Sequence, residues 1–162
     1  MGQLTKREAT PTNTDAALEA LLPLSGPSST WQSREAPGLE TTTTLHWTNG
    51  ARLTGTKEQA QRALQAVDES LRIASPRDVG LWLTKCRALT AMAQDDGNEL
   101  TASAYLEKLM PYPADVVKHT LETWPDCNTF FPKWNELREI MDQHVTRRNN
   151  MKAALEAALR GD

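Results

Sequence analysis

The sequence predicts an all-α protein: a small helical bundle with a disordered N-terminal arm and a long C-terminal helix. Apolar residues recur at helical spacing from about residue 57 onward. Prolines and capping residues mark where successive helices begin. The first part of the chain lacks both signals. We therefore expect a mostly disordered arm at 1–55, a helical domain at 56–140, and a projecting end of the last helix at 141–162.

Turn and linker residues dominate the arm, where Ser, Thr, Pro and Gly are frequent. Helical spacing occurs only from Thr14 to Leu24, with Thr14 as the expected N-cap. A helix this short is marginal alone and is expected to dock on something. A β-hairpin is also predicted, pairing Thr41–Thr48 with Arg52–Thr54.

The domain is expected to begin with two helices. Thr56 caps the first, and Ser75 followed by Pro76 and Asp78 is a strong start signal for the second. The second helix is expected to stop around 95–97. Their apolar faces comprise Ala60, Ala63, Leu64, Val67 and Leu71, then Val79, Trp82, Leu83, Cys86 and Leu89.

Two further helices are expected before the last one. Asn98 caps the third, which ends at Pro111. Pro113 opens the fourth, with Asp115 in the first turn where the helix dipole favours a negative charge. Pro125 then begins a short connection to Thr129. The apolar faces comprise Ala102, Leu106, Leu109 and Met110, then Val116, Val117, Thr120, Leu121 and Trp124.

The last helix is expected to run from Pro132 to about Arg160. Its apolar residues approach heptad spacing. Such a helix extends roughly 40 Å, longer than so small a domain covers, so part of it is expected to project. Its stripe comprises Trp134, Leu137, Met141, Val145, Met151, Leu155 and Leu159.

Charge and cysteine usage narrow the function classes. The net charge is −3 and the sequence pI is about 5.7, which gives no sign of the basic face that duplex DNA requires. Cys86 and Cys127 form no CxxC motif, which favours a reducing compartment. The sequence contains neither a signal-peptide pattern nor an apolar run long enough for a membrane span. We expect a protein of the host-cell cytoplasm that does not enter a membrane.

Catalytic motifs are not evident. His46, His119 and His144 lack metal-ligand spacing and are expected at the surface. Cys86 falls on an apolar helix face and is expected in the core. The sequence has no GxxxxGK[ST] loop for nucleotide phosphates and no EF-hand register. We therefore expect no enzymatic activity, no cofactor and no metal site.

Features suited to binding a partner are more evident. Phe130 and Phe131 precede a proline and cannot both point inward easily, so one is expected as a surface anchor. The end of the last helix is amphipathic, with a basic cluster beside its apolar stripe, and suits a groove or a second copy of the chain. The alternatives are core packing for the aromatic residues and a solvated helix face for the charges. The candidate partner-binding residues are Phe131, Arg147, Arg148, Met151, Leu155 and Leu159.

A pattern of prolines and aromatic residues runs through the second half of the domain. It comprises Tyr112-Pro113, Leu121 and Trp124, Phe130-Phe-Pro-Lys-Trp134 and Glu136-Leu137, with Trp82 and Tyr105 upstream. Over roughly residues 78–150 the chain resembles the phage replicative-helicase loader and inhibitor family. The resemblance implies a small, all-helical, non-catalytic phage or prophage protein that binds a hexameric replicative helicase, holds it inactive and delivers it to an initiator. The sequence departs from the family in its N-terminal arm and long last helix, so no contact residue is carried over.

The leading hypothesis is therefore an accessory protein of DNA replication that binds a replicative helicase. One alternative is a DNA-binding or transcription-regulating protein, since the helices around 98–110 and 113–124 are separated by a short turn as in a helix-turn-helix. That second helix exposes acidic as well as basic residues, which makes a poor recognition face. Another alternative is an inhibitor of a host protein or a self-assembling protein.

Overall fold

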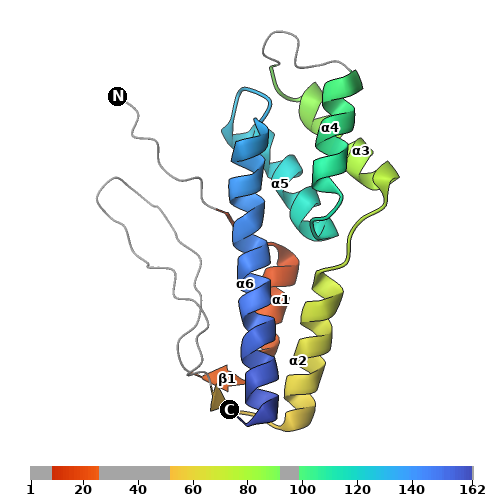
Figure 1. Cartoon of the computed structure of the whole chain (residues 1–162). Helices are drawn as coiled ribbons and strands as arrows, with labels where there is room; N and C mark the ends of the chain where they lie inside the picture. The colour runs from red at the N-terminus through yellow and green to blue at the C-terminus, as the bar shows by residue number, and fades with distance from the viewer. Residues whose placement is uncertain (1–8, 26–51, 92–98, 162) are drawn as a thin grey trace, which may run out of the picture. The chain divides into compact units, whose positions relative to one another are not determined.

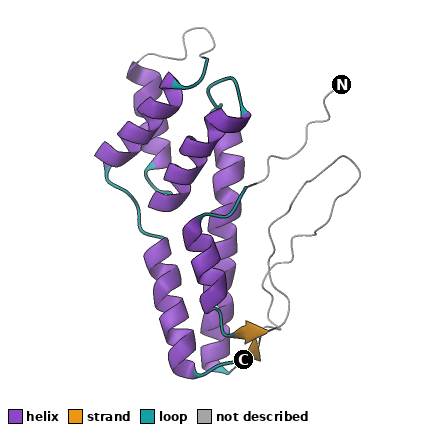
Figure 2. Cartoon of the chain, turned by 180° about the vertical axis from the view of Figure 1, so that it is seen from behind, coloured by secondary structure: helices purple, strands orange, loops and turns teal. Residues whose placement is uncertain are grey.

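A computed structural model describes residues 9–25, 52–91 and 99–161. These ranges contain six helices and one pair of two-residue strands, so the prediction of an all-α fold is confirmed (Figures 1 and 2). None of these helices is long and apolar enough to cross a membrane. The elements are α1 Asn13–Leu21, β1 Leu24–Ser25, β2 Arg52–Leu53, α2 Lys57–Ser70, α3 Pro76–Ala88, α4 Glu99–Leu109, α5 Ala114–Cys127 and α6 Trp134–Arg160.

The described chain divides into two compact units. Unit 1 is formed by Leu71–Asp142 and contains α3, α4, α5 and the first part of α6. Unit 2 is formed by the described parts of Glu8–Ser70 and Gln143–Asp162. It contains α1, the strand pair, α2 and the rest of α6. The long helix α6 therefore contributes residues to both cores.

Unit 1 is built around α3, which packs against both α4 and α5. The predicted apolar stripes of these helices meet in one core, as their spacing requires. Trp82, Phe131 and Trp134 are partly buried against this core. The fully buried members are Val79, Leu83, Cys86, Leu109, Val116, Val117, Leu121, Trp124, Leu137 and Met141.

Helix ends in unit 1 follow the sequence signals in some places only. The hydroxyl of Ser75 accepts a hydrogen bond from the backbone NH of Asp78 at 3.2 Å, as expected of an N-cap. Helix α5 does not end at Pro125 but continues to Cys127. Pro125 gives up one backbone hydrogen bond, and the helix still closes through the Asn128 NH, which donates to the Trp124 carbonyl at 3.0 Å. Helix α3 ends at Ala88, earlier than expected, and Leu89 is 70% exposed instead of buried. The expected end at 95–97 and the expected cap at residue 98 lie outside the described residues.

In unit 2, α1, α2 and the C-terminal part of α6 lie side by side (Figure 1). Leu22, Leu24, Leu53, Leu64 and Leu159 pack against their shared core. The buried members of the core are Leu18, Ala60, Ala63, Val67, Met151 and Leu155. The prediction that 141–162 projects is therefore wrong. Its apolar stripe is covered by α1 and α2, which the sequence placed in an arm and in a separate helix.

The N-terminal arm is also ordered in part. Helix α1 begins two residues earlier than expected, and its N-cap is Thr12, not Thr14. In β2, Leu53 pairs with Leu24 of β1 in an antiparallel register. The predicted partner Thr41–Thr48 lies outside the described residues, as do 1–8 and most of the remaining arm.

Candidate functional site

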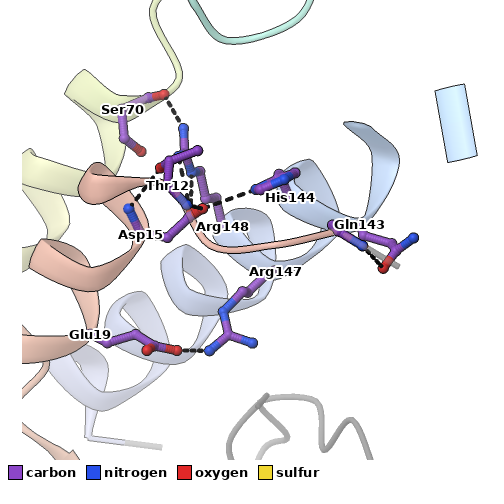
Figure 3. A network of polar contacts seen from close by, with 9 residues as sticks. Thr12, Asp15, Glu19, Ser70, Gln143, His144, Arg147 and Arg148 are labelled. Atoms are coloured by element: carbon purple, nitrogen blue, oxygen red, sulfur yellow. Dashed lines mark hydrogen bonds and ion pairs between the residues drawn. The ribbon is translucent and has the colours of Figure 1, made fainter. Parts of the chain in front are cut away.

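A buried carboxylate at the start of α1 organises the polar contacts of unit 2 (Figure 3). Asp15 is the third residue of the helix and forms a capping box with Thr12. The Asp15 Oδ2 atom accepts from the Thr12 NH at 2.8 Å, and the Thr12 hydroxyl accepts from the Asp15 NH at 3.0 Å. This reciprocal pair satisfies backbone donors that a helix start leaves open. The same carboxylate is fully buried, so its charge needs further partners.

Those partners come from α6. Arg148 donates from Nε and Nη2 to Asp15 Oδ1 at 3.1 and 3.0 Å, a two-pronged contact that matches the planar guanidinium. Arg148 Nη1 donates to the Ser70 carbonyl of α2 at 2.7 Å. His144 Nδ1 lies 2.9 Å from Asp15 Oδ2. One cluster of side chains thus joins α1, α2 and α6.

The cluster holds Asp15 in its ionised form. Burial by itself raises the pKa of this carboxyl. The hydrogen bond from His144 and the positive charge of Arg148 outweigh burial and hold the pKa well below its usual range. The carboxylate is therefore charged at neutral pH and accepts hydrogen bonds only.

Two more ion pairs surround this cluster. Arg147 contacts Glu19 of α1 (Figure 3). Burial lowers the pKa of Arg147 to about 10, which still leaves its guanidinium charged at neutral pH. Lys152 Nζ lies 2.9 Å from Asp68 Oδ1 of α2, at the solvent edge.

These contacts show that most of the partner-binding residues predicted on the last helix are buried inside the protein. Arg147 and Arg148 are 4% and 0% exposed, and their charges face α1 instead of solvent. Met151 and Leu155 are fully buried in the core of unit 2. Leu159 is half-buried against the same core. The amphipathic stripe of α6 is occupied by the chain itself.

His144 also departs from the prediction, because it is fully buried beside Asp15 instead of at the surface. Cys86 is buried in unit 1 as predicted, and burial raises the pKa of its thiol to about 11. A thiol with that pKa is protonated at neutral pH and is a poor nucleophile. Within the described ranges, no group of three or more His, Cys, Asp or Glu side chains is placed to hold a metal ion. The Asp15 cluster therefore has a structural role: it holds α1 in place against α6.

A different surface in unit 1 exposes large apolar side chains. We call it the outer patch and define it by Leu81, Leu89 and Phe130 with the basic residues Arg77 and Lys85. The three apolar residues are 50%, 70% and 63% exposed. Burial of all three would remove a substantial apolar area from water, which is typical of a binding surface.

Backbone contacts join the two chain segments that form the outer patch. The Ala91 NH donates to the Thr129 carbonyl at 2.8 Å, and the Phe131 NH donates to the Ala91 carbonyl at 2.9 Å. This isolated parallel bridge places the chain after Leu89 beside Phe130. The indole NH of Trp124 donates to the Phe130 carbonyl at 2.7 Å, which holds the backbone of Phe130 in place.

One phenylalanine is packed inward and the other is exposed, but the exposed one is Phe130 and not the predicted Phe131. The ring of Phe131 packs edge-on against Tyr105, with centroids 5.4 Å apart, and is half-buried. Phe130 is the residue that points to solvent. Phe131 is therefore a support of the core, and Phe130 takes its place as the candidate anchor.

Sequence signals for the missed features exist in retrospect. Thr12 and Asp15 have the spacing of a capping box, which begins two residues before the expected cap at Thr14. His144 and Arg148 are four residues apart and share one face of α6. Nothing in the sequence says that these pairs meet, since more than 120 residues separate them.

Comparison with known proteins adds no assignment. No family model, curated protein or solved structure matches the chain.

Proposed function

We propose that the protein is a non-catalytic accessory factor of phage or prophage DNA replication that binds a bacterial replicative helicase and holds it inactive for loading. The proposal starts from the pattern of aromatic residues and prolines that resembles the helicase loader and inhibitor family. One structural observation supports it: these residues come together in unit 1. Trp124, Phe131, Trp134 and Leu137 all belong to one core or pack against it.

The aromatic cluster behind the pattern is well defined. The rings of Tyr105 and Tyr112 both pack edge-on against Trp134, at centroid distances of 6.3 and 6.2 Å. The Tyr105 hydroxyl donates to the Pro132 carbonyl at 2.9 Å, and the Tyr112 hydroxyl donates to Asp142 at 2.6 Å. The pattern therefore specifies a rigid folding unit, and a rigid unit loses little entropy when it presents a binding surface.

Unit 1 also carries the outer patch. Four of the five large apolar residues that stand out as exposed in the described chain belong to unit 1, and three of these four lie in the outer patch. Exposed apolar side chains on a rigid helical platform are what a protein partner buries in a stable interface. This favours a protein partner over nucleic acid, which is bound mainly through cationic groups.

The experiment is a titration of a purified hexameric replicative helicase with the full chain. Complex formation is measured by sedimentation velocity, and ATP hydrolysis and strand separation by the helicase are measured in parallel. We expect a complex of defined stoichiometry and suppression of strand separation. The control is the variant Leu137→Asp, which places a charge in the core of unit 1 and should abolish the effect together with the fold.

The outcomes separate the alternatives. No complex with the helicase, together with salt-dependent binding to duplex DNA, would support the DNA-binding reading. No complex with either would favour a different host protein as the partner. The helicase proposal fails in both cases.

A further inference from the structure

Helix α3 has an exposed side whose residues follow a regular order. Arg77, Leu81, Lys85 and Leu89 are each four residues apart and all exposed. Residues at this spacing lie nearly above one another on a helix, so they form one continuous stripe about 18 Å long. Along it, basic and apolar side chains alternate. The opposite side of α3 is buried in the core through Val79, Leu83 and Cys86, so the helix is fixed with this stripe outward.

Phe130 extends the stripe at its C-terminal end. The bridge between Ala91 and Phe130 ties the two segments together, and the Trp124 indole holds the Phe130 carbonyl. The backbone under the phenyl ring is therefore fixed before any partner arrives. A pre-positioned aromatic anchor loses little conformational entropy on binding, which is the property of interface hot spots.

The charges of the stripe indicate which charged groups a partner should carry. Within the described part of the chain, Arg77 and Lys85 have no ion-pair partner. Asp78 is the only acidic side chain of α3, and it lies in the first turn, where it stabilises the helix start. A partner that covers the apolar residues therefore also meets the exposed cations of Arg77 and Lys85. Carboxylates at matching positions would complement them, whereas basic groups would be repelled.

We propose that the outer patch binds an acidic amphipathic helix of the helicase, in which carboxylates alternate with apolar side chains at one-turn spacing. The partner's apolar side chains cover the three exposed hydrophobic residues, and its carboxylates pair with the two cations. This inference rests on the proposed function for the identity of the partner. The surface itself and the chemistry of its occupant follow from the residues of unit 1 alone.

The first test measures affinity for the purified helicase with paired variants of the full chain. Leu89→Ser with Phe130→Ser removes the apolar anchors, and Arg77→Glu with Lys85→Glu reverses the charge. Each pair should weaken binding at least tenfold. Raising the ionic strength from about 0.05 M to about 0.5 M should weaken wild-type binding severalfold and leave the charge-reversed variant almost unchanged.

Matched controls come from unit 2. Leu21 is 53% exposed, similar to the patch residues, and Arg62 is an exposed cation in the middle of α2. Leu21→Ser and Arg62→Glu should bind within twofold of wild type. Lys85 lies in the last turn of α3, where a cation also stabilises the helix, so each variant is first checked for wild-type helix content and thermal unfolding. Folded patch variants that bind as tightly as the controls would overturn the inference while leaving the proposed function intact.

A second test does not depend on the helicase. Phe130→p-benzoylphenylalanine is photo-crosslinked in bacterial lysate, and the captured segment is sequenced. The same replacement at Leu21 serves as the control. An acidic amphipathic segment, whose capture is lost when Arg77→Glu and Lys85→Glu are added, supports the surface even if wild type fails to bind the helicase. A basic segment, nucleic acid, or capture no greater than from position 21 would overturn it.

Discussion

Removal of the Asp15 carboxylate should release α1 from unit 2. In the variant Asp15→Ala, four donor contacts are lost: one from the Thr12 NH, one from His144 and two from Arg148. The guanidinium of Arg148 stays buried and keeps the Ser70 carbonyl and the Thr12 hydroxyl as partners, but it loses the carboxylate that balances its charge. Removal of one member of a buried ion pair typically costs about 3–5 kcal/mol, because the other charge is left uncompensated.

That cost is large for this part of the chain. The capping-box contribution of about 1 kcal/mol is included in it, since the same side chain serves both roles. A nine-residue helix has almost no stability of its own, and α1 buries few apolar side chains, chiefly Leu18. We therefore expect α1 to detach in Asp15→Ala before the rest of the protein unfolds.

Hydrogen exchange measures this directly. The described tryptophans, Trp82, Trp124 and Trp134, all lie in unit 1, so tryptophan fluorescence of that region does not report on α1. Amide protection is compared in peptides from α1 and from α5. Asp15→Ala should lose most protection in α1 and retain it in α5.

The double variant Asp15→Ala with Arg148→Met completes a thermodynamic cycle. Replacement of both charges by apolar groups removes the uncompensated guanidinium, so the double variant should recover about 2 kcal/mol relative to Asp15→Ala. Strictly additive costs, or wild-type protection of α1 in Asp15→Ala, would show that the carboxylate cluster does not hold α1 in place.

Other consequences follow from burial and charge. The pKa of Asp15 is lower in the folded protein than in the unfolded chain, so its carboxylate stabilises the fold fully above the unfolded-chain value of about 4. This stabilisation declines as the pH falls below that value. The difference in the free energy of unfolding between wild type and Asp15→Asn, measured in urea, should therefore shrink from pH 5 to pH 3. Leu155→Ala empties a fully buried site in unit 2 and should cost about 2–5 kcal/mol in the same assay, whereas Leu21→Ala, at a half-exposed site, should cost less than about 1 kcal/mol. Cys127 is exposed and Cys86 is buried, so a thiol reagent should modify one cysteine rapidly and the second only as fast as unit 1 opens; two fast cysteines would contradict the described core.

The helical pattern of unit 1 was largely predictable because its information is local. Proline positions, the Ser75 cap and apolar periodicity identify α3 to α6, and their buried faces follow from spacing. The errors are equally local. Helix α3 ends before its expected stop, and that difference moves Leu89 from the core to the surface.

Unit 2 could not be predicted because it depends on contacts between distant segments. From the sequence, the apolar stripe of α6 with Met151 and Leu155 looks like an exposed binding surface. In the structure α1 and α2 cover it. Periodicity identifies an amphipathic face but does not say what covers it. Arg148 shows the same limit, since a cation beside an apolar stripe is normally a solvated rim and here neutralises a carboxylate more than 130 residues away.

Hydrogen exchange of the full chain with and without the purified replicative helicase tests whether the protein binds this partner through unit 1. We expect new protection in peptides that cover 76–91 and 128–133, with exchange across 146–160 of α6 unchanged. New protection confined to the C-terminal part of α6, or no change at saturating helicase, would contradict it.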